Sequence, residues 1–219
     1  MRALIDRHGA LDVSRWTRGR PRDPFGSLLR SIVGQQLSVA AARSIFARLV
    51  EANGGTSPTP EELLRLRAGT LRRAGLSAAK VEYVRDLARH VLRGDLELRA
   101  LRRLDDEEAI ERITAVKGLG RWTAEMFLMF HLRRPDVFPV GDLGVRRAIE
   151  RAYGREMPTP QELRAIAERW RPYRTLASLY LWESLTGPPL DARTRSARGA
   201  TRPGPGSTRS APRRARRSA

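Results

Sequence analysis

The sequence predicts an all-α fold. Apolar residues recur at helical spacing along almost the whole chain, and no segment shows the sustained two-residue alternation of a half-buried strand. Helix start signals agree, because Thr59-Pro60 and Thr159-Pro160 each place an N-cap threonine before a proline at the first helical position. Glu62 and Glu162, three residues after each threonine, complete two capping boxes.

The predicted elements follow in order along the chain. A first pair of helices flanks residues 34–38, and acidic residues at 105–108 begin a later helix, where they suit the positive end of the helix dipole. Gly118 and Gly120 interrupt the pattern between two helices, and Gly187-Pro188-Pro189 ends the last one. The predicted helices span residues 24–33, 38–52, 60–66, 77–92, 105–114, 120–132, 142–152, 160–170 and 173–185.

The net charge and the absence of cysteine limit the classes of function that the protein can have. The chain of 219 residues carries 42 Lys and Arg against 24 Asp and Glu, a formal net charge of +18. Such a field favours a polyanionic partner, nucleic acid first and an anionic membrane surface second. An arginine-rich genome would explain why Lys80 and Lys117 are the only lysines, but not the excess of base over acid. Because there is no cysteine, disulfides, cysteine-ligated zinc and iron–sulfur clusters are excluded.

The composition changes abruptly near the end of the chain. We expect a globular domain over residues 1–186, followed at 187–219 by a tail of mostly Arg, Ser, Ala, Pro and Gly. Such a segment cannot bury enough surface to offset its ordering entropy, so it is predicted to be disordered. Its basic charge either reflects composition alone or attracts phosphates without sequence preference.

The sequence shows neither an export signal nor a membrane span. No apolar run approaches the roughly 18 residues of a membrane span, and the first residues lack the apolar core of a signal peptide. We therefore expect a soluble protein of the bacterial cytoplasm, located at the nucleoid.

A glycine turn lies between the helices predicted at 105–114 and 120–132. Gly118 and Gly120, one residue apart, make a tight hairpin that another molecule can approach closely. Amides at the start of the following helix form an anion site, so this unit either grips a DNA phosphate or is a helix connection without a ligand. The candidate DNA-binding residues of this helix–hairpin–helix unit, about 105–132, are Lys117, Gly118, Leu119, Gly120, Arg121 and Thr123.

Five landmarks occur in order along the chain. They are Leu28–Ser38 (LLRSIVGQQLS), Gly75–Lys80 (GLSAAK), the hairpin with Trp122, Phe138–Asp142 (FPVGD), and Arg169–Arg174 (RWRPYR) with Trp182. With these landmarks the chain resembles, from about Asp23 to Ser184, the helix–hairpin–helix superfamily of DNA glycosylases, specifically its 3-methyladenine, or alkylation-repair, branch. The resemblance implies two helical subdomains that form a DNA-binding cleft, with the hairpin on its wall. The landmarks begin too early to leave room for the N-terminal α/β domain of the longer subfamily.

The resemblance assigns the catalytic role to Asp142. Breaking an N-glycosidic bond builds positive charge on the deoxyribose, and a fixed carboxylate stabilises that charge and can activate the attacking water. Placement at a helix N-terminus favours the ionised form of a carboxylate. The alternative is an ordinary N-cap aspartate without a catalytic role.

Trp122 separates two kinds of glycosylase. Superfamily members that also cleave the DNA backbone carry a Schiff-base lysine directly after the hairpin, where this chain has Trp122. The resemblance therefore implies a monofunctional enzyme that leaves an abasic site.

The resemblance also places Trp122 and Trp182 in the base pocket, where a desolvated indole face favours a cationic purine by about 0.5–2 kcal/mol. Met126 stands where some relatives have another aromatic, and Phe25 is a further pocket candidate that core packing also explains.

A base must leave the helical stack to reach such a pocket. Gln35, Gln36 and Leu37 correspond to the loop that fills the vacated space in relatives, with Gln36 or Leu37 as the plug. Alternatively, these residues only cap the helix that begins near Ser38. The resemblance implies no required cofactor.

Family members often hold a monovalent cation through hairpin carbonyls. In this chain those carbonyls would lie near Ala115, Val116 and Gly118. His8, His90 and His131 show no metal-ligand spacing.

The predicted function is hydrolytic removal of alkylated purines, of the 3-methyladenine and 7-methylguanine type, from double-stranded DNA by a monomer. One alternative is a glycosylase for other damaged or mismatched bases, although branches of that kind carry a four-cysteine cluster or a catalytic lysine that this chain lacks. The other is a helix–hairpin–helix protein that binds DNA damage without excising it.

Overall fold

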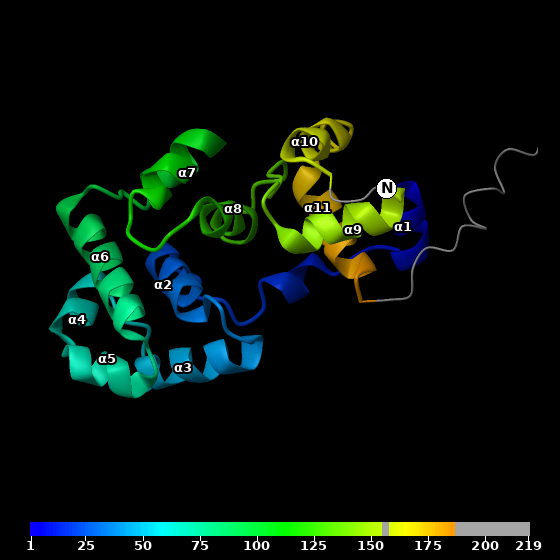
Figure 1. Cartoon of the computed structure of the whole chain (residues 1–219). Helices are drawn as coiled ribbons and strands as arrows, with labels where there is room; N and C mark the ends of the chain where they lie inside the picture. Colours follow the sequence, from blue (N-terminus) through cyan, green and yellow to red (C-terminus); the bar gives the residue numbers. More distant parts are fainter. Residues whose placement is uncertain (155–157, 187–219) are drawn as a thin grey trace, which may run out of the picture. The chain divides into compact units, whose positions relative to one another are not determined.

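The structure is a computed structural model that describes residues 1–154 and 158–186 (Figure 1). Within these ranges every regular element is a helix, which confirms the predicted all-α class. The described residues belong to one compact unit, and none of their helices is long and apolar enough to cross a membrane. The predicted tail at 187–219 lies outside the described residues.

Eleven α-helices and two short 3₁₀ helices make up this part of the chain. They are α1 (Arg2–His8), η1 (Val13–Trp16), α2 (Pro24–Gly34), α3 (Val39–Ala52), α4 (Pro60–Arg65), α5 (Ala68–Ala74), α6 (Ala78–Arg93), η2 (Ala100–Arg102), α7 (Asp106–Thr114), α8 (Arg121–Phe130), α9 (Leu143–Tyr153), α10 (Pro160–Glu168) and α11 (Arg174–Ser184).

Side-chain caps start the helices at the predicted places. Thr59, Asp105 and Thr159 each accept a hydrogen bond from the backbone amide three residues later, and the glutamate at that position bonds back to the cap amide. These are complete capping boxes, which satisfy two of the otherwise unpaired amides at each helix start. The two threonine boxes predicted from the sequence are therefore confirmed.

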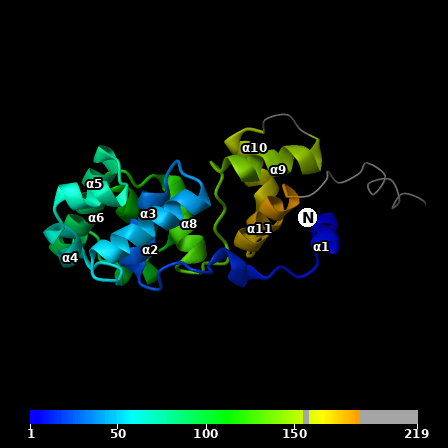
Figure 2. The ribbon, with the colours of Figure 1, turned by 90° about the horizontal axis from the view of Figure 1, so that it is seen from below.

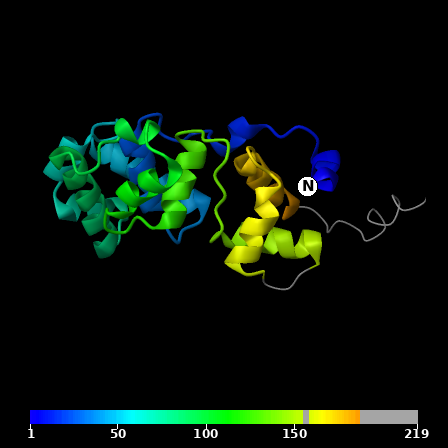
Figure 3. The same cartoon turned by 90° about the horizontal axis from the view of Figure 1, so that it is seen from above.

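The helices pack in two groups, which Figures 1, 2 and 3 show from three directions. The first group, α2 to α8, encloses the larger apolar core, in which Leu28, Ile32, Leu49 and Leu128 are fully buried. In the second group α11 packs against both α1 and α9, and α10 lies beside them. The two predicted helical subdomains are thus present, and the functional residues lie where the groups meet.

Four elements were not predicted from the sequence: α1, η1, η2 and α5. The first two are short and lie ahead of the first predicted cap, and η2 has only three residues. α5 has only seven residues, includes a glycine, and has as its N-cap Arg67, which makes no side-chain cap bond. Its stability therefore comes from burying Leu71 and Ala74 in the core rather than from a local start signal.

Candidate active site

The carboxylate of Asp142 is held by three N–H donors from three helices. Asp142 is the N-cap of α9, and its Oδ1 accepts from the amide of Val145 at 2.7 Å. The same oxygen accepts from Nε1 of Trp182 on α11 at 2.8 Å, whereas Oδ2 accepts from Nε1 of Trp122 on α8 at 2.7 Å. The structure thus brings together the three residues that the sequence placed at the centre of the site.

Gly144 makes this convergence possible. A Cβ added at Gly144 would lie 2.9 Å from Cδ1 of Trp182 and 3.0 Å from Oδ1 of Asp142, closer than real side chains allow. The indole of Trp182 therefore occupies the space that a side chain at 144 would need. Sequence reasoning missed this glycine because its role depends on a residue 38 positions later in the chain.

Aromatic rings hold Trp182 in place. Its ring centroid lies 5.4 Å from that of Trp16 and 6.0 Å from that of Phe130, and each such pair is worth about 0.5–1.5 kcal/mol beyond its burial. Neither Trp16 nor Phe130 was predicted. Phe130 follows Met126 by four residues along the apolar face of α8, a spacing that could have indicated it, whereas Trp16 lies in a segment without helical periodicity.

The predicted pocket residues differ in exposure. Trp122 is 49% exposed, so ring surface remains available for stacking while its N–H edge faces Asp142. Trp182 is mostly covered by its aromatic neighbours. Met126 and Phe25 are 8% and 5% exposed and pack in the larger core, so Phe25 serves the core in this structure.

The hairpin packs on the first turns of α6. Gly118 has φ of 85°, and a Cβ there would lie 2.4 Å from the ring of Tyr83. Gly120, the N-cap of α8, meets nothing within 4 Å of an added Cβ and has no left-handed φ. The fold therefore requires Gly118 but leaves the space beside Gly120 open, which suits the close approach of a ligand to the helix amides.

Both hairpin cations are paired with carboxylates. Lys117 donates its amide to Asp86 at 2.8 Å and its ammonium to Glu82 at 3.0 Å. Arg121 donates from both terminal nitrogens to Glu107, at 2.8 and 2.5 Å, and from Nε to Glu125 at 3.1 Å. A DNA phosphate would therefore compete with these carboxylates for either side chain.

Two other predicted DNA-binding residues of the hairpin are buried. Leu119 is 3% and Thr123 is 5% exposed, because their side chains face the core beneath the turn. Only their backbone groups can contribute to a surface contact, so a role for these two side chains in DNA contact does not fit the structure.

The predicted plug loop joins α2 to α3 beside the hairpin. Gln35 donates from Nε2 to the Gly118 carbonyl at 2.7 Å, and Lys80 donates to the carbonyls of Val33 and Gln35 at 2.7 and 2.8 Å. Gln35 therefore ties the loop to the hairpin. Gln36 has a left-handed φ of 57° and Leu37 is 40% exposed, so these two lie at the surface as a plug would require.

Two of the three carbonyls expected near a monovalent cation already accept a hydrogen bond. The Gly118 carbonyl accepts from Gln35, and the Val116 carbonyl accepts from the Leu119 amide at 3.1 Å. Each carbonyl oxygen has two lone pairs, so these bonds leave a lone pair on each oxygen. Among the described residues, no group of three or more His, Asp or Glu side chains could hold a metal ion.

Glu125 is a buried carboxylate one helical turn after Arg121 and was not predicted from the sequence. It is 3% exposed, and burial raises its pKa to about 7 despite the opposing effect of Arg121. The charges of Glu107 and Asp142 raise its pKa further. Its burial distinguishes it from the exposed acids of the hairpin, and periodicity alone could have indicated this, because Glu125 lies in an otherwise apolar helix.

A comparison with known protein families agrees with this geometry. Residues 29–172 match the model of the HhH-GPD superfamily base excision DNA repair proteins. The chain belongs to this superfamily, in which HhH stands for helix–hairpin–helix.

Individual relatives show to which branch of the superfamily the chain belongs. The chain is 37% identical over 166 residues to DNA-3-methyladenine glycosylase 1 of Schizosaccharomyces pombe, covering 74% of this chain and 73% of the relative. It is 33% identical to the putative DNA-3-methyladenine glycosylase YfjP of Bacillus subtilis, of whose length it spans 58%. These relatives place it in the 3-methyladenine glycosylase branch.

Solved structures give the same result. The 3-methyladenine DNA glycosylase Mag1 of S. pombe, in complex with abasic DNA, superposes with a TM-score of 0.73 at 33% identity, covering 85% of this chain and 91% of that one. A DNA-3-methyladenine glycosidase from Bacillus halodurans gives a TM-score of 0.70 at 38% identity, covering 83% of this chain and 86% of that one. Both structures share the helical architecture described above.

The two hairpin glycines should respond differently to alanine. Gly118→Ala should strongly destabilise the fold, because the new Cβ would overlap Tyr83 and the residue needs a left-handed φ. Gly120→Ala should keep the unfolding temperature within a few degrees, because the new Cβ meets no protein atom, but weaken DNA binding, because the methyl enters the space where we expect a phosphate. Thermal unfolding and DNA-binding titrations test both. Equal stability losses in the two variants would contradict this assignment.

Gly144→Ala should reduce catalysis without preventing folding. The added methyl must displace either the Trp182 ring or the carboxylate of Asp142. We expect base release to fall at least tenfold while binding to unmodified DNA is retained. Gly141→Ala is the matched control, since its Cβ would meet nothing within 4 Å. Normal base release by Gly144→Ala would show that the convergence of the two indoles is dispensable.

Glu125 should make stability fall as the pH rises through the neutral range. Its pKa is about 7 in the folded chain against 4.5 without the fold, so the folded state binds more protons between these values. The free energy of unfolding of the wild type, relative to Glu125→Gln, should therefore decrease with pH in that window by roughly 1.4 kcal/mol per unit and level off above it.

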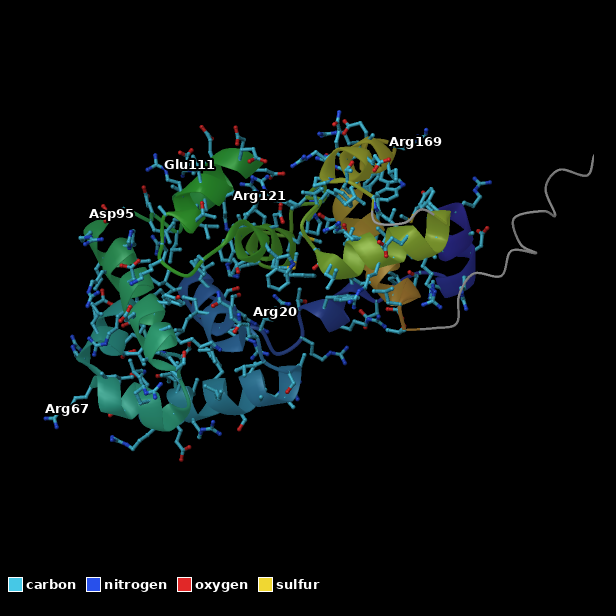
Figure 4. All side chains as sticks on the ribbon, in the orientation of Figure 1. Arg20, Arg67, Asp95, Glu111, Arg121 and Arg169 are labelled. Atoms are coloured by element: carbon cyan, nitrogen blue, oxygen red, sulfur yellow. The ribbon has the colours of Figure 1, made fainter. Side chains whose placement is uncertain are left out.

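Denaturant unfolding at pH 5, 6, 7 and 8 measures this difference. Glu111→Gln, at an exposed position on α7 that Figure 4 labels, is the control, because it removes a carboxylate that is not among the charges acting on Glu125. Parallel pH profiles for the wild type and Glu125→Gln would contradict the raised pKa.

Proposed function

We propose that this chain is a monofunctional DNA glycosylase that hydrolyses the N-glycosidic bond of alkylated purines in double-stranded DNA and leaves an abasic site. The observation that carries this conclusion is the carboxylate of Asp142, fixed by two indole N–H groups and a helix amide. A protein that only binds DNA damage needs no carboxylate oriented in this way. The geometry therefore favours catalysis over binding alone.

The two oxygens of Asp142 have different tasks in this mechanism. Oδ1 is anchored by both Val145 and Trp182, whereas Oδ2 is held only by the half-exposed Trp122. Oδ2 is consequently the oxygen that can face a deoxyribose once Trp122 gives way to the entering nucleotide. A preorganised negative charge at this point stabilises the positive charge that develops on the sugar.

The bonds that break and form in this reaction involve only the nucleoside and water, and no cofactor is needed. As the bond between C1′ and the base nitrogen breaks, its electron pair leaves with the base and C1′ becomes electron-deficient. Water then adds to C1′ and loses a proton, for which Asp142 is the nearest base. A purine alkylated at N3 or N7 already carries positive charge in the nucleoside and departs as a neutral base, so its departure needs no acid from the protein.

The absence of a catalytic lysine fits simple hydrolysis. Lys80 donates to the carbonyls at the end of α2, and Lys117 pairs with Glu82 at the surface of α6. Trp122 occupies the position directly after the hairpin. No Schiff base with the sugar follows from these positions.

DNA binding combines several parts of the first helix group. The open amides near Gly120 contact a phosphate, Gln36 or Leu37 fills the space of the flipped base, and the exposed ring of Trp122 stacks on that base. Stacking on an electron-poor purine supports the preference for alkylated bases. We propose in addition a monomer that acts at the bacterial nucleoid and requires no cofactor, with room for a structural monovalent cation at the hairpin.

Asp142→Asn should abolish base release but preserve DNA binding. The amide can still cap α9, because asparagine is as good an N-cap as aspartate, but it carries no negative charge. Released bases are separated by chromatography after incubation with methylated DNA, and we expect at least a 10²-fold loss. Asp95→Asn, an exposed aspartate labelled in Figure 4, is the control and should release bases normally. Release of no methylated purine by the wild type would instead favour another lesion class or a binding protein.

A further inference from the structure

A hollow of about 740 Å³ lies beside the N-terminus of α2 and is distinct from the site around Asp142. The segment 14–22, η2 and the end of α8 form its walls. Of the residues described around Asp142, Phe130, which stacks on Trp182, also lines the hollow, whereas Asp142, Trp122, Trp182 and the hairpin do not. Five arginines and a histidine do: Arg18, Arg20, Arg22, Arg102, Arg133 and His131.

Four of the five arginines have no acceptor for their guanidinium groups. In the described part of the chain, the side chains of Arg20, Arg22, Arg102 and Arg133 form neither an ion pair nor a hydrogen bond. Arg134, next to Arg133, instead donates to Asp106 and to the carbonyls of Leu101 and Leu104. Arg134 thus holds the fold together, whereas the four guanidinium groups in the hollow keep their N–H donors for a ligand.

The nearby acids are already engaged. Asp12 pairs with Arg18 at 3.5 Å and accepts from Ser14, and Asp23 accepts from the amide of Gly26 as the N-cap of α2. The hollow therefore keeps an excess of positive charge. Like charges held this close repel one another, and an anion placed among them would relieve that repulsion.

Arg20 shows most clearly that a cation in this hollow is partly buried without a counter-ion. Its guanidinium carbon lies 4.5 Å from the centroid of the Phe130 ring, so the group is partly withdrawn from water without a counter-ion. Burial, together with the charge of Arg30, lowers the pKa of Arg20. Figure 4 places Arg20 beside α2, on the side facing η1. A cation held against an aromatic ring in this way is ready for an anion to enter beside it.

We propose that this hollow binds phosphate groups. Guanidinium forks match phosphate oxygens in pairs, and the hydroxyl of Ser27 supplies a further donor on the same walls. The volume exceeds that of a water molecule, about 30 Å³, many times over and has room for two or more linked phosphates. The phosphates come either from a DNA backbone, in which case the proposal rests on the DNA binding proposed above, or from a free polyphosphate.

The test uses the full chain with two exposed arginines replaced, Arg102→Gln with Arg133→Gln. The control removes the same charge elsewhere, Arg65→Gln with Arg67→Gln, at exposed positions on α4 and just after it, where Figure 4 labels Arg67. Pyrophosphate is the free probe, and its effect is the rise in unfolding temperature. Unmodified duplex DNA is the second probe, and its effect is the slope of log K against log[salt].

We expect the variant in the hollow, but not the control, to change at least one readout. Loss of half or more of the rise in unfolding temperature with pyrophosphate supports a free phosphate ligand. A salt slope shallower by about 1.8 supports contact of both arginines with the DNA backbone. Identical behaviour of variant and control with both probes would overturn the proposal. Because neither probe contains a lesion, failure of the proposed glycosylase activity would leave this result intact.

Discussion

The structure depends on one carboxylate that three helices share. Asp142 starts α9 as its cap, and the indoles of Trp122 and Trp182 reach it from α8 and α11. Since α8 belongs to the first helix group and α9 and α11 to the second, the carboxylate is a hydrogen-bonded joint between them. The aromatic contacts of Trp182 with Trp16 and Phe130 cover one side of the joint with apolar surface, which strengthens the hydrogen bond from Trp182 by excluding water. The side of Trp122 stays half exposed.

The hairpin shows a second constraint: its side chains are engaged within the protein, so contact with a ligand falls to its backbone. Its two cations are paired with Glu82, Glu107 and Glu125, and two of its other side chains are buried. The space beside Gly120, at the start of α8, therefore remains open to a ligand. Contact through backbone amides reads no sequence, which suits a protein that must meet damaged bases in any sequence context.

Features that depend on contacts between residues close in the sequence were predicted, whereas features that depend on contacts between distant segments were mostly missed. Thr59, Asp105 and Thr159 cap through neighbours three residues away, so their helices were predicted closely. Asp142, Trp122 and Trp182 came from the order of landmarks, and the structure brings them together. Trp16 and Gly144 matter through contacts with distant segments, which local patterns do not contain. Helix α5 was missed for the same reason, because only core packing defines it. The buried carboxylate of Glu125 was missed although it is the single acid in the apolar helix α8.

The shared carboxylate also links its own geometry to the contact between the two helix groups. Val145 and Trp182 lie in the same group as Asp142, so their bonds to Oδ1 do not depend on that contact. The bond from Trp122 to Oδ2 does cross between the groups, as does the stacking of Phe130 on Trp182. A molecule whose helix groups have separated therefore keeps a capped α9 but loses the donor that orients Oδ2, so the oriented oxygen exists only in the fully assembled fold.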